Sequence, residues 1–165
     1  MKEIRIETIV KVYESYDSFS PTEQLLFEKA KKACDNAHAP YSKFHVGAAV
    51  LLENGLMFEG NNQENAAYPS GLCAERVALF YAMANYPNTA VKAIAITVDY
   101  ENTDFEEIVS PCGGCRQVIA EYEHKFEQDI VLYLLAPKQK VCVLPSVSSI
   151  LPLLFNGDIL QAFNK

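Results

Sequence analysis

Three cysteines in two short motifs constrain this chain more than any other feature of its sequence. A CAE motif occupies residues 73–75, and a PCGGC motif occupies residues 111–115. The cysteines of the second motif lie about one helical turn apart, so their two thiolates can bind one tetrahedral zinc ion. Cys73 supplies a third thiolate. Three protein ligands leave the fourth position open for water, as in catalytic zinc sites.

The C-x2-C pair alone also fits a redox-active pair or half of a structural zinc site. The sequence has no second C-x2-C pair to complete a zinc ribbon. An odd total of five cysteines, without an export signal, favours free thiols or metal ligands over disulfides. Cys34 and Cys142 lie in apolar surroundings and are predicted to be buried and inert. The three histidines follow no ligand spacing, and none is assigned to the metal.

Two charged residues next to Cys73 suit a catalytic zinc. A carboxylate at Glu75 can take a proton from zinc-bound water and pass it to a substrate, as a general acid and base. Three thiolates carry excess negative charge, which weakens the acidification of water by the metal. Arg76 is the predicted counter-charge, and Arg116 is a second candidate. Both motifs are predicted to begin helices, where the positive end of the helix dipole favours thiolates.

Helical and strand patterns alternate along the chain without a repeat or a linker, which predicts a single domain over residues 1–165. Ser20-Pro21-Thr22-Glu23 has the form of a capping box and predicts a helix over residues 21–37. An apolar stripe predicts a second helix over 72–86, Pro111 opens a third, and residues 148–160 contain a short helical turn. Strands are predicted over 3–13, 44–52, 56–60, 91–98, 129–136 and 139–144, and loops over 61–70 and 99–107. This alternation indicates a sheet that helices cover on both faces.

Charge and hydropathy limit the classes of partner that the chain can bind. The net charge is −7, and residues 44–111 hold two basic and nine acidic side chains, so this segment carries the whole deficit. A polyanion would be repelled from it, whereas a small neutral or cationic ligand would not. No apolar run approaches the roughly 20 residues that span a bilayer, and the first residues lack the core of a signal peptide. We therefore expect a cytoplasmic protein that binds neither nucleic acid nor membrane.

Three longer segments resemble the cytidine deaminase family. They are PYSKFHVGAAV (40–50), GNNQENAAYPSGLCAERVAL (60–79) and SPCGGCRQVIAE (110–121). The zinc motifs alone are typical of the whole deaminase superfamily, and their combination with the flanking segments is more specific. The resemblance implies a three-layer α/β/α fold with a central mixed five-stranded sheet, a homotetramer and one zinc ion per subunit. Residues 1–18 are then an N-terminal extension, which can add an edge strand or alter subunit contacts.

The same resemblance implies an activity and a role for individual residues. The activity is the hydrolytic deamination of cytidine and deoxycytidine to uridine and deoxyuridine in pyrimidine salvage, with release of ammonia. The implied roles are zinc ligation by Cys73, Cys112 and Cys115; proton transfer by Glu75; charge compensation by Arg76; ribose binding by Asn62 and Glu64; stacking on the base by Phe44; binding of the base carbonyl by the Ala74 N–H; contact of the Ser110 carbonyl with the departing amine; a further substrate contact at Ala66; and a contact of Phe155 with a neighbouring subunit's pocket. His45 and Gln63 depart from the family's usual residues.

Other functions remain open at this stage. A deaminase of another aminated heterocycle, of the blasticidin type, would use the same zinc chemistry. A polynucleotide deaminase would need a basic stripe or an aromatic platform, and the sequence shows neither. A non-catalytic zinc module would bind a partner and would not need the carboxylate of Glu75.

Overall fold

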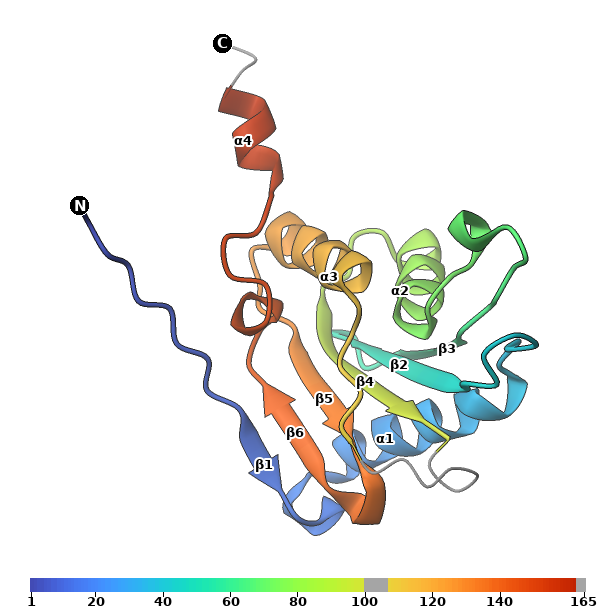
Figure 1. Cartoon of the computed structure of the whole chain (residues 1–165). Helices are drawn as coiled ribbons and strands as arrows, with labels where there is room; N and C mark the ends of the chain where they lie inside the picture. The colour runs from blue at the N-terminus through green and yellow to red at the C-terminus, as the bar shows by residue number, and fades with distance from the viewer. Residues whose placement is uncertain (100–106, 163–165) are drawn as a thin grey trace.

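A mixed six-stranded sheet runs through the centre of the computed structural model, with helices on both faces (Figure 1). The structure describes residues 1–99 and 107–162. The strand order is β1-β6-β5-β4-β2-β3; β4 and β5 are parallel, and all other neighbours are antiparallel. The strands are β1 (Lys11–Tyr13), β2 (Val46–Leu52), β3 (Met57–Asn61), β4 (Val91–Val98), β5 (Val131–Leu135) and β6 (Val141–Leu144). The helices are α1 (Pro21–Ala33), α2 (Ala74–Asn85), α3 (Gly113–Phe126) and α4 (Gly157–Ala162), with short 3-10 turns at Tyr16–Ser18, Cys34–Asn36, Tyr68–Ser70, Pro137–Gln139 and Val147–Ser149.

Local sequence signals explain how several elements begin and end. The hydroxyl of Ser20 accepts from the Glu23 N–H, and the Glu23 carboxylate accepts from the Ser20 N–H, so the predicted capping box starts α1. In the β2–β3 hairpin, the side chain of Asn54 accepts from the Leu56 N–H. Gly55 adopts a φ of +84°, which favours a residue without a Cβ atom.

The sheet separates two apolar clusters, because alternate residues of a strand point to opposite faces. Ala48, Val50 and Leu52 of β2 pack under α2 and α3, together with Ile94 and Ile96 of β4. Residues of the other parity pack against α1 and include Ala49, Leu51, Ala93 and Ala95. These layers confirm the α/β/α prediction and hold the first turns of α2 and α3 on one side of the sheet.

The structure corrects the predicted length of the first strand and the predicted number of strands in the sheet. It does not describe most of the predicted loop over residues 99–107. Only residues 11–13 of the predicted strand 3–13 pair; they form β1, the edge strand beside β6. This pairing gives the sheet six strands where the resemblance implied five, and the sixth comes from the N-terminal extension. In the predicted loop 99–107, residues 100–106 lie outside the described residues. No helix in the described part of the chain is long and apolar enough to span a membrane.

Gly60 sets the distance between β3 and α2. A Cβ atom at this position would lie 2.4 Å from the backbone nitrogen of Ala78 and 2.7 Å from the carbonyl oxygen of Ala74. Both are backbone atoms of α2, so relief of the clash requires a movement of the helix. The helix start that carries residues 73–76 therefore depends on the missing side chain of Gly60.

We predict that Gly60→Ala destabilises the fold by about 1–3 kcal/mol, as overpacking does in other cores. A Cβ atom at Gly157 would meet only the His124 ring, at 3.5 Å or more, so Gly157→Ala is the control and should change stability by less than about 0.5 kcal/mol. Urea unfolding of both variants measures the difference. Equal stability of the two variants would contradict the close approach at Gly60.

Candidate metal centre and active site

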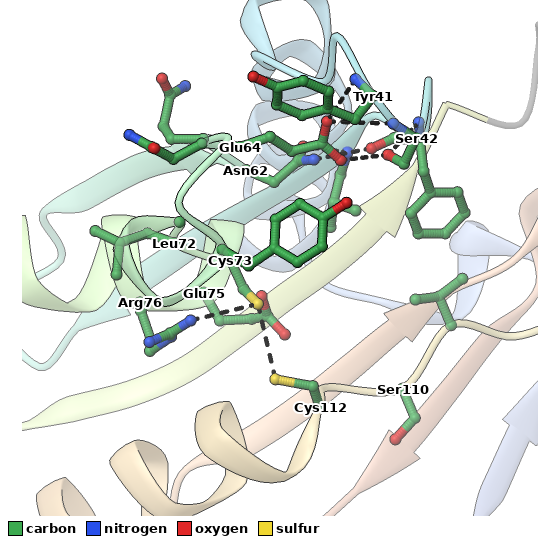
Figure 2. A pocket seen from close by; sticks show the side chains of 17 residues that line it. Tyr41, Ser42, Asn62, Glu64, Leu72, Cys73, Glu75, Arg76, Ser110 and Cys112 are labelled. Carbon is green, nitrogen blue, oxygen red and sulfur yellow. Dashed lines mark hydrogen bonds between the residues drawn. The ribbon is translucent and has the colours of Figure 1, made fainter.

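The N-termini of α2 and α3 bring three cysteine sulfurs together, as Figure 2 shows for Cys73 and Cys112. Cys73 is the N-cap residue of α2, Cys112 is the N-cap residue of α3, and Cys115 lies in the first turn of α3. The Sγ atoms of Cys73 and Cys112 are 3.7 Å apart, and those of Cys112 and Cys115 are 3.5 Å apart. All three sulfurs lie within 4.8 Å of one another.

This sulfur cluster fits a zinc ion. Ligand sulfurs about 2.3 Å from a tetrahedral ion lie about 3.8 Å from each other, close to the two separations seen here. All five cysteines of the chain are free, so no disulfide competes for these thiols. Cys34 and Cys142 are buried in the fold, as predicted, and take no part in the cluster.

The charge distribution favours a thiolate at Cys73. Hydrogen bonds from the Cys115 thiol and from Arg76 lower the pKa of Cys73, while the same sulfur–sulfur contact and burial raise the pKa of Cys115. The Nη2 atom of Arg76 lies 3.7 Å from the Cys73 sulfur (Figure 2). The guanidinium therefore offsets negative charge directly at one member of the cluster.

Arg116 takes a different position from the one that a counter-charge requires. Within the described residues it donates 2.8 Å hydrogen bonds to the carbonyl oxygens of Pro111 and Ile150 and a 3.1 Å bond to the Ser110 hydroxyl. Its guanidinium thus ties the segment before α3 to the C-terminal turn. Of the two arginines considered from the sequence, Arg76 is the one that meets a thiol.

A buried carboxylate lies beside the cysteines. Glu75 is only 3% exposed, and its Oε2 atom has no hydrogen-bond partner among the described residues. Burial raises the pKa of this carboxyl, and the nearby charge of Cys73 raises it further. A buried, unpartnered carboxyl oxygen is costly unless a ligand or solvent molecule uses it. Its position at a pocket wall therefore suits proton transfer.

The cysteines and Glu75 open onto a pocket of about 780 Å³, large enough for a small-molecule ligand. Four residues assigned to the substrate from the sequence line it, namely Phe44, Asn62, Glu64 and Ser110. Ala66 and Ala74 do not line it. Ala66 is exposed in a bend, and Ala74 is buried at the first position of α2, where it can offer only its backbone N–H.

The side chains of Asn62 and Glu64 make hydrogen bonds to the loop at the rim of this pocket (Figure 2). The Asn62 amide accepts from the Val46 N–H and donates to the Phe44 carbonyl, both at 2.8 Å. The Glu64 carboxylate accepts from the backbone N–H groups of Tyr41 and Ser42 and from the Ser42 hydroxyl. This last bond is the main cause of the lowered pKa of Glu64. Both side chains thus hold the loop that presents Phe44.

Other pocket residues were not singled out from the sequence. They include Tyr41, Ser42, Tyr68, Leu72 and Val109. Tyr41 and Ser42 lie within the PYSKF segment, which was the only sequence signal that pointed to them. Phe155, by contrast, does not line the pocket, and its side chain is 53% exposed. Gln117 donates a 2.7 Å hydrogen bond to its carbonyl oxygen, which holds this segment beside α3.

The fold and the site place three clustered cysteine thiols at two helix starts, next to a buried carboxylate, and this arrangement fits a zinc enzyme. Residues 20–128 match the family model of the cytidine and deoxycytidylate deaminase zinc-binding region. The chain belongs to this family.

Curated relatives and solved structures agree with this assignment. The cytidine deaminase of Sporosarcina psychrophila is 48% identical over 97 residues, which cover 59% of this chain and 67% of that protein. The cytidine deaminase of Halalkalibacterium halodurans is 45% identical over 98 residues, covering 59% and 70% of the two chains. The crystal structure of cytidine deaminase from Burkholderia pseudomallei superposes with a TM-score of 0.68 at 37% identity, over 80% of this chain and 98% of that one.

We predict that the purified protein holds about one zinc ion per chain. Cys73→Ala should weaken zinc affinity more than about 100-fold, because a direct ligand contributes more than the outer-sphere contacts, which contribute roughly 10- to 100-fold. Cys142→Ala, a buried cysteine in β6, is the matched control and should keep its zinc. Metal analysis after dialysis against a chelator checks both. Zinc retained by Cys73→Ala would exclude this cysteine as a ligand.

Proposed function

We infer that the protein is a zinc-dependent cytidine deaminase, which hydrolyses cytidine and deoxycytidine to uridine and deoxyuridine and releases ammonia. One observation carries this conclusion: a carboxyl oxygen of Glu75, without a hydrogen-bond partner among the described residues, lies beside three clustered thiols at the wall of a pocket of about 780 Å³. Membership of the deaminase family supports it. The named relatives are themselves cytidine deaminases.

Cys73, Cys112 and Cys115 would hold the zinc ion, which supplies a Lewis acid that lowers the pKa of water towards neutrality. Glu75 takes a proton from the attacking water and delivers it to N3 of the cytosine ring. The water oxygen bonds to C4, and its second proton moves to the exocyclic nitrogen. The bond from C4 to that nitrogen then breaks, so that ammonia leaves and C4 keeps the oxygen as a carbonyl. The raised pKa of Glu75 suits this role, because the group must accept and release a proton in one cycle.

The pocket wall and the start of α2 support a nucleoside as the ligand. The Ala74 N–H at the start of α2 would bind the base carbonyl, Phe44 would stack on the ring, and the Ser110 carbonyl would face the departing amine. Beyond its contacts with the loop, the Asn62 amide retains one donor hydrogen and one acceptor lone pair. Glu64 retains one acceptor position on Oε1. These groups would bind ribose hydroxyls.

The test is the change in ultraviolet absorbance when cytidine is mixed with the zinc-loaded protein, with blasticidin and free cytosine as alternative substrates. We predict that Glu75→Gln keeps the zinc but lowers cytidine turnover at least about 100-fold, because an amide cannot carry the proton. Glu121→Gln, on the exposed face of α3, is the matched control and should leave turnover unchanged. Bound zinc without cytidine turnover would overturn the proposal in favour of another heterocycle. Full activity of Glu75→Gln would overturn the proton-transfer role.

We further propose that the enzyme acts in cytoplasmic pyrimidine salvage as a homotetramer, with one zinc ion per subunit. Five free thiols fit a reducing compartment. The acidic central segment disfavours polynucleotides as substrates. The exposed ring of Phe155, on a segment held against α3, is accessible to a neighbouring subunit's pocket.

Light scattering on the purified protein is expected to give four times the mass of one chain. In that assembly, Phe155→Ala should raise KM for cytidine. Leu153→Ala, a change at a more exposed apolar residue of the same segment, is the control and should leave KM unchanged. A monomeric mass would contradict both the tetramer and the role of Phe155 in a neighbouring site.

A further inference from the structure

The first ten residues form an exposed arm outside the region that matches the family. The family match begins at residue 20, whereas the arm precedes β1 at the edge of the sheet. Every residue from 1 to 10 is exposed, and the arm extends away from the body of the molecule (Figure 1). Thr8 is held to the body by a 2.5 Å hydrogen bond from its hydroxyl to the Ser149 carbonyl.

The arm has the sequence of a β-strand but pairs with no strand in the described part of the chain. Its even positions from 4 to 10 are Ile, Ile, Thr and Val, all β-branched, and its odd positions from 3 to 7 are Glu, Arg and Glu. Ile4 is 75% exposed and Ile6 is 51% exposed. The backbone of residues 1–9 makes no hydrogen bond to another described residue's backbone. An exposed strand of this composition is a template for pairing with another chain.

We propose that this arm pairs with the same arm of a second copy of the chain, antiparallel and with Ile6 opposite the partner's Ile6. In this register Arg5 lies opposite the partner's Glu7, and Glu7 lies opposite the partner's Arg5. The 2.6 Å contact between Arg5 and Glu7 within one arm places both on the same face, so the two pairs form one group of alternating charges. The β-branched rows of both arms then line the other face.

Charge selects this register over its neighbours. A shift of two residues in one direction places Glu3 opposite the partner's Glu7, and a shift in the other direction places Glu7 opposite the partner's Glu7. Both arrangements set like charges against each other, which destabilises a strand pair. A shift of one residue sets the apolar row of one arm against the charged row of the other. Among these registers, the one centred on Ile6 is the one that avoids both conflicts.

Two paired arms form a two-stranded ribbon, and each arm is attached to the sheet of its own copy, which can stabilise that ribbon. A two-stranded ribbon alone is marginally stable in water. Each arm continues into β1, however, which pairs with β6 through Lys11, Val12 and Tyr13. The paired arms would therefore continue the edge strand β1 of each copy beyond its sheet. The two-fold symmetry of the pair makes it a closed, isologous contact. The contact is independent of the deaminase reaction, since the arm contributes no residue to the pocket.

Disulfide formation at Ile6 tests the register in the zinc-loaded full chain. In the proposed pair, a cysteine at position 6 faces its own copy, so mild oxidation of Ile6→Cys should yield a covalent dimer on a non-reducing gel. A cysteine introduced by Ile4→Cys faces Thr8, and one introduced by Ile9→Cys faces Glu3, so their dimer yields should be several-fold lower. The wild-type chain gives the background from its own cysteines. Equal yields at positions 4, 6 and 9, or no dimer at position 6, would overturn the proposal.

Charge exchange provides a second and independent test in the Ile6→Cys background. Arg5→Glu sets a carboxylate opposite the partner's Glu7 and should lower the dimer yield several-fold. Glu7→Arg sets two guanidinium groups opposite each other and should lower the yield to a similar extent. The combined change Arg5→Glu with Glu7→Arg restores opposite charges and should restore the yield. These positions are exposed, so the fold is retained in each variant. A combined variant as low as the single ones would overturn the register.

Discussion

The contact between two helix starts is the constraint on which the rest of this structure depends. The first turns of α2 and α3 must approach until three sulfurs lie within 4.8 Å of one another. Three sulfurs at that spacing repel one another as thiolates, so the arrangement needs positive charge. The helix dipoles and the Arg76 guanidinium supply part of it, and a zinc ion held by the three sulfurs would supply the rest. The close approach of Gly60 to the α2 backbone then holds one of the two helix starts against the sheet.

Polar side chains that line the pocket also stabilise the fold around it. Asn62 and Glu64 use most of their hydrogen-bonding capacity on the loop that carries Phe44. What remains on each side chain is available to the ribose of a nucleoside in the proposed function. Arg116 differs from these two residues, because its three hydrogen bonds all join it to other parts of the polypeptide. The rim of the pocket is therefore held in place by hydrogen bonds from its own polar side chains.

The N-terminal region lies outside the residues that match the deaminase family model. Its residues 11–13 add a sixth strand to the sheet, and the residues before them leave a β-branched row in solvent. The sequence pattern of the whole segment predicts a strand, yet only the part beside β6 forms one. A strand needs a neighbour to satisfy its backbone groups, and within one chain the edge of β6 offers that neighbour to three residues only.

The sequence by itself determined the elements with strong local signals, and it predicted the chemistry of the metal site. Four features depend on residue types at short spacing, so they are readable without coordinates: the capping box of α1, the Asn-Gly hairpin, the strand over residues 91–98 and the C-x2-C pair. Only the tertiary structure decided that Arg76 rather than Arg116 meets a thiol and that Glu75 keeps one oxygen unpartnered among the described residues. It also showed that Tyr41 and Ser42 join the pocket rim. These outcomes depend on contacts between residues far apart in the chain, because helix and loop placement on the sheet selects which neighbours a side chain can reach.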